Sequence, residues 1–196
     1  MSLNYSFRPN LIAKEETFTL DSGRLAISDR GTIAFSDIRE IRTYDYPGVS
    51  FPGGAKLAPG AKRCVIHLKS ARAIIVTNNH FVAAGSFEDR SATYDPFVAA
   101  LIHEVSAANA ATIFISGMPT ALWIGWIVIV AMAFLMVPLL ILAIIGTILD
   151  GKWISPGMII PTLFLLGIVI GVRPLLRTLR RNWPRRYDPR VASVAS

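Results

Sequence analysis

Residues able to carry chemistry are few in this chain, and Cys64 with His67 is the pair closest to a reactive site. A nucleophilic thiol needs a base within hydrogen-bonding reach. The segment from Cys64 to Lys69 has the pattern of a β-strand, in which residues three apart point to opposite faces. We therefore expect Cys64 to be a small core residue and His67 to face away from it.

Other candidate sites are incomplete in the same way. His67, His80 and His103 have no partners at metal-ligand spacing. The run from Pro52 to Lys56 lacks the spacing of a phosphate-binding loop. We therefore predict a non-enzymatic protein with no catalytic residues, no metal and no cofactor.

The segments that would position these residues read as short strands followed by one helix. After an irregular arm over 1–14, residues 15–78 alternate strand-like runs with turns, and Leu25 and Ile27 share one face. Ile38 and Ile41 are three apart, which indicates a bulge or helical turn. A helix is predicted from Asp95, as its N-cap, to about Ala108, with Pro96 in the first position. Its apolar stripe is Phe97, Leu101 and Val105. This is an α+β plan.

Residues 15–108 resemble the bacterial pleckstrin-homology-like domains. The likeness lies in the segment F-S-D-I-x-x-I, Phe35 to Ile41, and in a helix beginning Y-D-P-F-V-x-x-L, Tyr94 to Leu101. The resemblance implies a bent antiparallel sheet or split barrel capped by the helix. It also implies a domain without shared catalytic residues, a scaffold that several members join to transmembrane hairpins.

Two long apolar runs follow a short linker over 109–119. The first, 120–149, and the second, 154–172, contain no charged residue and are separated by a turn over 150–153. About 20 apolar residues suffice to cross a bilayer. We expect a two-helix transmembrane hairpin; the alternative is a buried helical hairpin.

The tail over 173–196 holds seven arginines and one acid, Asp188, whereas residues 1–119 are nearly neutral. Positive charge beside a membrane span stays in the cytoplasm. We therefore expect a multi-pass protein of the bacterial inner (cytoplasmic) membrane with both termini cytoplasmic. The single cysteine agrees with a reducing compartment. Because the net charge of +7 resides mainly in the tail, we expect no nucleic-acid partner.

Particular residues follow from that topology. Anionic lipid headgroups are expected at the following basic residues of the tail and the 47–63 loop: Arg173, Arg177, Arg180, Arg181, Arg185, Arg186, Lys56, Lys62 and Arg63. Tryptophans expected at the membrane interface are Trp123, Trp126, Trp153 and Trp183. Gly167 and Gly171 form a G-x-x-x-G pair that favours helix packing, within the chain or with a partner.

The function expected from the sequence is a membrane-anchored interaction module, an accessory subunit of a larger inner-membrane complex. Its partner would be a membrane protein or a second copy, held at a sheet edge or at the 47–63 loop. The alternative is a module that responds to anionic membrane lipids.

Overall fold

The computed structural model describes residues 3–46, 49–50, 56–58, 60–83, 86–149 and 176–192. The chain divides into two compact units. The sheet unit comprises Met1–Ser50, Lys56–Met118 and Pro184–Ser196, and the helical unit comprises Phe51–Ala55 and Pro119–Trp183. The described part of the chain is mainly β-sheet, with the helices α1, α2 and α4.

The first sheet of the sheet unit is antiparallel, in the order β1-β2-β3-β4. Its strands are β1 (Leu3–Phe7), β2 (Glu16–Asp21), β3 (Arg24–Ile27) and β4 (Gly31–Ala34). Alternate residues of β1, β2 and β3 are buried, among them Leu25 and Ile27 as predicted. Gly23, at φ +79°, makes the tight turn between β2 and β3 that a residue with a Cβ would resist. Residues 3–7, expected to be irregular, thus belong to the sheet.

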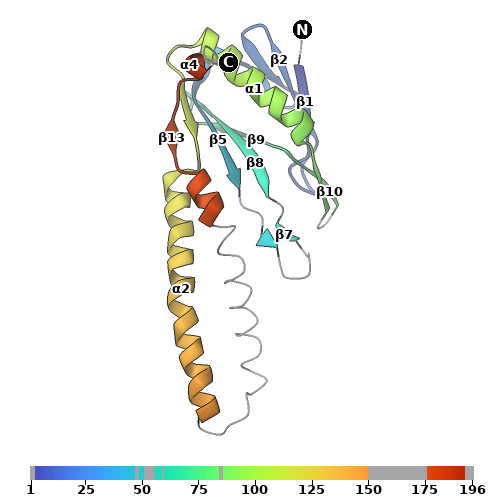
Figure 1. Cartoon of the computed structure of the whole chain (residues 1–196). Coiled ribbons are helices and arrows are strands. Elements are labelled where there is room, and N and C mark those ends of the chain that lie inside the picture. Colours follow the sequence, from blue (N-terminus) through green and yellow to red (C-terminus); the bar gives the residue numbers. More distant parts are fainter. Residues whose placement is uncertain are drawn as a thin grey trace. The chain divides into compact units, whose positions relative to one another are not determined.

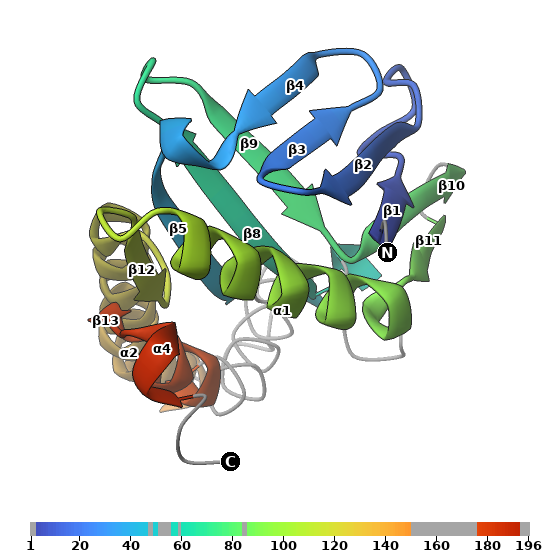
Figure 2. The ribbon, with the colours of Figure 1, turned by 90° about the horizontal axis from the view of Figure 1, so that it is seen from above.

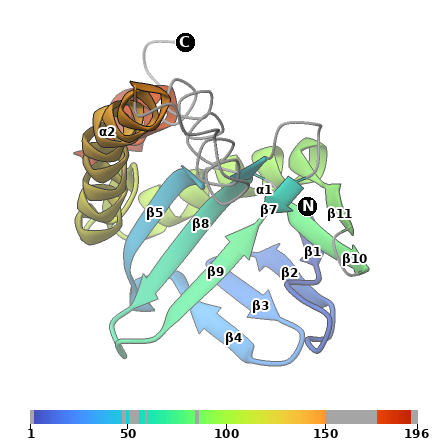
Figure 3. The same ribbon diagram turned by 90° about the horizontal axis from the view of Figure 1, so that it is seen from below.

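The second sheet has the order β13-β12-β5-β8-β9. Its strands are β5 (Ile38–Tyr46), β8 (Ala61–Leu68), β9 (Ala73–Thr77), β12 (Ile113–Ser116) and β13 (Arg185–Arg186). β5, β8 and β9 lie side by side in Figure 3. The register shifts between Ile38 and Glu40, so that Ile38 and Ile41 are both buried. The shift agrees with the predicted bulge or helical turn, which was expected to place both isoleucines on the core side.

β12 runs parallel to β5, which corrects the expectation of a wholly antiparallel sheet. The remaining described elements are η1 (Phe35–Asp37), β6 (Val49–Ser50), β7 (Lys56–Ala58), β10 (Asn79–Ala83) and β11 (Ser86–Asp89). β10 and β11 form an antiparallel hairpin.

Helix α1 (Ser91–Ala108) begins four residues before the predicted start. The Asp89 carboxylate accepts hydrogen bonds from the Ser91 backbone N–H (2.9 Å) and hydroxyl (2.6 Å). Asp89 therefore accepts from a backbone N–H group at the start of the helix. The sequence predicts that Asp95 has this role. Pro96 consequently lies inside the helix.

α1 lies across the two sheets and closes the core (Figure 2). The predicted stripe of Phe97, Leu101 and Val105 is fully buried, which confirms it. Phe97 packs 5.5 Å from the ring of Tyr5 and 6.4 Å from the ring of Phe18, measured between centroids. The helix thus joins β1 and β2 through aromatic contacts.

The sheet unit is completed by a segment from the far end of the chain. β13 and α4 (Pro189–Ala192) follow the helical unit in sequence. β13 pairs with β12, and α4 contacts α1 (Figure 1). The arginine-rich tail was expected to lie on lipid. Its 184–192 part instead belongs to the sheet unit.

In the helical unit, α2 (Thr120–Leu149) has the bounds predicted for the first apolar helix. The described part of the chain nevertheless contains no helix long and apolar enough to span a membrane.

This finding contradicts the predicted transmembrane hairpin. The same finding contradicts the predicted fold class, which included that hairpin. It also contradicts the predicted location, a multi-pass protein of the inner membrane with cytoplasmic termini. The second predicted helix, 154–172, and the turn before it lie outside the described residues.

Candidate interaction surface

The loop between β1 and β2 is held in one conformation by two of its own side chains. The Asn10 side-chain oxygen accepts hydrogen bonds from the backbone N–H groups of Ile12 (3.0 Å) and Ala13 (2.8 Å). The Arg8 guanidinium donates to the carbonyl oxygens of Ala13 (2.9 Å) and Leu11. Asparagine commonly organises turns in this way. The loop backbone is therefore fixed without help from its apolar side chains.

Those apolar side chains point to solvent. Ile12 is 95% exposed and Leu11 is 62% exposed. On the neighbouring β10–β11 hairpin, Val82 is 54% exposed and Phe87 is 40% exposed. We call these four side chains the apolar tip. A single exposed aliphatic residue is ordinary, but four exposed apolar residues on two neighbouring segments make this end of the sheet unit a candidate contact site.

Arg8 connects the two segments of the apolar tip. Its carbonyl oxygen accepts a hydrogen bond from the Phe81 N–H (2.8 Å), and its own N–H donates to His80 Nδ1 (3.1 Å). Its guanidinium lies 5.8 Å from the centroid of the Phe81 ring. Figure 2 shows β1, β10 and β11 at the same end of the sheet unit. The loop and the hairpin are thus positioned together.

Charges of both signs lie beside the apolar tip. Arg90 donates to the carboxylates of Glu15 (3.0 Å) and Glu88 (3.2 Å) and to the Ser6 carbonyl oxygen (2.8 Å). Hydrogen bonds from Ser6 and Arg90 lower the pKa of Glu15 below its usual value. Arg8, Lys14 and Arg90 therefore stand near three carboxylates, those of Glu15, Glu88 and Asp89, and the rim carries both signs of charge.

Asn78 anchors the hairpin to the start of α1. This buried side chain accepts from the Lys62 N–H (2.7 Å) and donates to Asp89 (2.8 Å) and the Ser91 hydroxyl (3.0 Å). Hydrogen bonds, chiefly from Ser91, lower the pKa of Asp89. A buried amide whose hydrogen-bonding groups are all satisfied holds the segments around it in fixed positions. It fixes the hairpin on the helix.

The candidate nucleophile lies elsewhere and faces inward. Cys64 is 0% exposed within the core, and burial raises the pKa of its thiol to about 12. His67 is half-buried and lies outside that core cluster. Two side chains on opposite faces of a strand cannot exchange a proton directly. The placement predicted for Cys64 is therefore confirmed.

The predicted lipid-binding residues of the loop are engaged within the chain or lie outside the description. Lys62 forms an ion pair with Asp95 at 2.6 Å. The Arg63 guanidinium lies 4.4 Å from the centroid of the Tyr46 ring. Lys56 lies in β7, and its side chain is not among those the structure describes.

The predicted lipid-binding arginines of the tail are divided between the two units. Arg177, Arg180 and Arg181 are exposed in helical residues 176–181 of the helical unit. Arg185 and Arg186 are exposed on β13 of the sheet unit. Arg173 lies outside the described residues.

The predicted interface tryptophans that are described pack inside the helical unit. The Trp123 indole N–H donates to the Leu179 carbonyl oxygen (3.0 Å), and its ring meets that of Trp183 edge-on at 4.5 Å. The buried indole N–H of Trp126 finds no hydrogen-bond partner among the described residues. Trp153 and the pair Gly167 and Gly171 lie outside them.

Sequence reasoning missed the apolar tip. The available signal was the run Pro9-Asn10-Leu11-Ile12, in which two turn-forming residues precede two apolar residues without strand or helix periodicity. Comparison with protein-family models, with curated proteins and with solved structures gave no match.

Proposed function

We propose that this protein is a non-enzymatic interaction module that binds a protein partner through the apolar tip. The observation that carries the proposal is Ile12, which is 95% exposed on a loop whose backbone Arg8 and Asn10 hold. The proposal agrees with the resemblance of residues 15–108 to pleckstrin-homology-like domains, a scaffold without shared catalytic residues.

The energetics favour such a role for Ile12. Moving an aliphatic side chain from water into an apolar pocket contributes about 1.5–3 kcal/mol. Ordering a flexible loop on binding would offset part of that gain. The hydrogen bonds of Arg8 and Asn10 reduce this cost because the loop is already ordered. Ile12 and Leu11 therefore act as preorganised anchors.

The charge around the apolar tip indicates the class of partner. Anionic membrane surfaces attract clusters of unpaired basic residues. Here Arg8 and Arg90 are engaged by carbonyl oxygens and by Glu15 and Glu88, and the exposed Lys14 on the same loop is one cation rather than a cluster. A protein surface with an apolar pocket and a mixed polar rim fits this arrangement better than anionic lipid.

The proposal can be tested by site-specific photo-crosslinking of the full chain in its native cell. A photoreactive residue at position 12 or 82 should give one discrete protein adduct. The matched control is position 75, because Ile75 is also an exposed aliphatic residue (49%) but lies on β9. Arg8→Ala, which releases the loop, should reduce the position-12 adduct at least several-fold.

Two results would contradict the proposal. One is the same set of adducts from positions 12 and 75, which would indicate random collision. The other is a position-12 adduct with lipid alone, together with binding of the purified chain to vesicles containing anionic phospholipid at physiological salt. That second result would make the apolar tip a lipid contact.

A further inference from the structure

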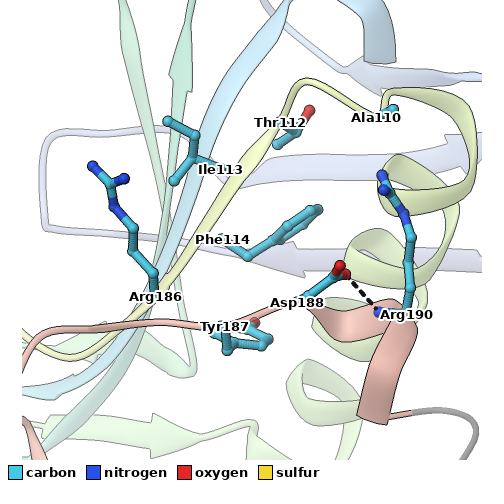
Figure 4. Close-up of a pocket in the computed structure, with 8 residues that line it drawn as sticks. All are labelled: Ala110, Thr112, Ile113, Phe114, Arg186, Tyr187, Asp188 and Arg190. Atoms are coloured by element: carbon cyan, nitrogen blue, oxygen red, sulfur yellow. Dashed lines mark hydrogen bonds between the residues drawn. The ribbon is translucent and has the colours of Figure 1, made fainter.

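Residues 185–190 lie in a groove between β12 and the C-terminal end of α1. Arg185 and Arg186 pair with Ser116 and Ile115 as a short added strand. The Tyr187 N–H then donates to the Phe114 carbonyl oxygen (3.1 Å). Figure 4 shows this segment passing beside β12. The backbone contacts are those of an extended peptide added to a sheet edge.

A tyrosine anchors the segment in this groove. The Tyr187 ring lies 6.2 Å from the Phe114 ring, between centroids, at a tilt of 54°. Burial raises the pKa of Tyr187, and a hydrogen bond with the Thr43 side chain opposes that rise. The groove therefore offers an aromatic floor at Phe114 and a polar group at Thr43 that suits a phenol.

An arginine three residues later caps the helix. Arg190 Nε donates to the Ser106 carbonyl oxygen (2.9 Å) and Nη2 to that of Asn109 (3.4 Å). Carbonyl groups at a helix C-terminus lack intrahelical partners and favour a cation. The Asp188 carboxylate accepts from the Arg190 N–H (3.0 Å) and fixes the turn between the two anchors. The end of α1 thus provides a site for a guanidinium.

The segment does not fill the groove. A cavity of about 390 Å³ remains on its β12 side, where Ile113 and Phe114 contribute to the lining (Figure 4). Another cavity, of about 400 Å³, lies on its α1 side, against Ala99, Ile102 and His103. Both hollows are open to the surface, so the flanks of the segment are not covered by the rest of the sheet unit. The segment therefore contacts the core through Tyr187 and leaves open space on both of its sides.

We propose that this groove binds extended peptides in which an aromatic residue is followed three positions later by arginine. Residues 185–190 occupy the groove as its internal ligand. A partner peptide would add a strand to β12, place its aromatic ring on Phe114 and its guanidinium on the carbonyl groups at the end of α1. This site is distinct in its residues from the apolar tip, so either could exist without the other.

The internal ligand must be displaced before such a peptide binds. A tethered segment competes at an effective concentration in the millimolar range. In the unaltered chain the tethered segment therefore occupies the groove, and only a peptide of high affinity can displace it. Variants that weaken the tethered segment should open it.

The test uses the full chain and a fluorescent peptide of the sequence WPRRYDPRVA, which matches residues 183–192. Tyr187→Ala combined with Arg190→Ala in the chain should raise the affinity for the peptide on the order of 100-fold over the unaltered chain. Arg72→Ala is the control, since it removes an exposed arginine between β8 and β9, outside the groove, and should leave affinity unchanged. A peptide in which alanine replaces its tyrosine or its last arginine should not bind.

Hydrogen exchange gives a second measurement that does not depend on the double variant folding. Millimolar peptide added to the unaltered chain should speed amide exchange at Arg185 and Tyr187, the residues of the segment whose N–H groups face β12, by displacing the tethered segment. The proposal is wrong if the folded double variant fails to bind the peptide. It is also wrong if exchange at these amides is unchanged by the peptide.

Discussion

Ser116, the last residue of β12, lies directly opposite Arg185, the first residue of β13, in an antiparallel pair. The helical unit connects these two residues in sequence. Inserted domains are tolerated where the ends of the host are close together. The pairing therefore makes the sheet unit a complete fold interrupted by an insertion.

Replacing residues 117–184 by Asn-Gly should leave the sheet unit folded. The dipeptide favours the tight turn that joins two antiparallel strands. The shortened protein should show a cooperative thermal transition and a β-rich circular dichroism spectrum. Molten behaviour of this protein, with a cooperative transition in the full chain, would show that the helical unit is needed for folding.

Substitutions of Leu101, in the core, and Ile12, in the apolar tip, should have different effects on the free energy of unfolding. Leu101→Ala should lower the free energy of unfolding by about 2–5 kcal/mol, because Leu101 is fully buried. Ile12→Ala should change it by less than about 0.5 kcal/mol, as expected for an exposed site. Urea unfolding of both variants checks this. Comparable losses would mean that Ile12 serves stability.

The alternation of buried residues predicts much of the sheet unit, because a side chain's face on a strand depends on local position alone. Leu25 and Ile27, the bulge at Ile38 and the stripe on α1 could all be predicted in that way. The helix start could not, because Asp89 caps Ser91 while Asp95 pairs with Lys62. Both carboxylates are plausible caps, and tertiary contacts decide between them.

Long-range pairing explains the other differences between sequence and structure. β13 has two residues and carries no periodicity, so its pairing with β12 depends on contacts that no local pattern encodes. Arg190 looked like one member of a basic tail, yet it lies on the carbonyl groups of Ser106 and Asn109. The exposure of Ile12 depends on the Arg8 and Asn10 hydrogen bonds and cannot be inferred from hydropathy.

Acid should destabilise the protein partly through Glu15. Its folded pKa is lowered, so its contribution to stability is complete above the unfolded value near 4.5 and is lost as pH falls through the lower folded value. In urea unfolding from pH 7 to pH 3, Glu15→Gln should lose less stability on acidification than the unaltered chain. Glu104→Gln, on α1, is the control and should follow the unaltered chain. Parallel curves for both variants would contradict a role for the Glu15 contacts.

The thiol of Cys64 should be unreactive in the folded protein. It is buried, and its raised pKa leaves little thiolate at neutral pH, while thiolate is the reactive form. Maleimide at pH 8 should modify Cys64 only slowly in buffer and rapidly in 6 M guanidinium, in which the chain is unfolded. Rapid labelling of the folded protein would place Cys64 in an accessible site and reopen the question of thiol chemistry.

The central claim, that Ile12 anchors a protein partner, is tested most directly by retention of that partner. The protein crosslinked at position 12 should be quantified in purifications of full-length Ile12→Ser, Ile75→Ser and the unaltered chain. We predict at least about a tenfold loss with Ile12→Ser, from the free energy of burying one aliphatic side chain, and no loss with Ile75→Ser. Equal retention by all three proteins would contradict the account.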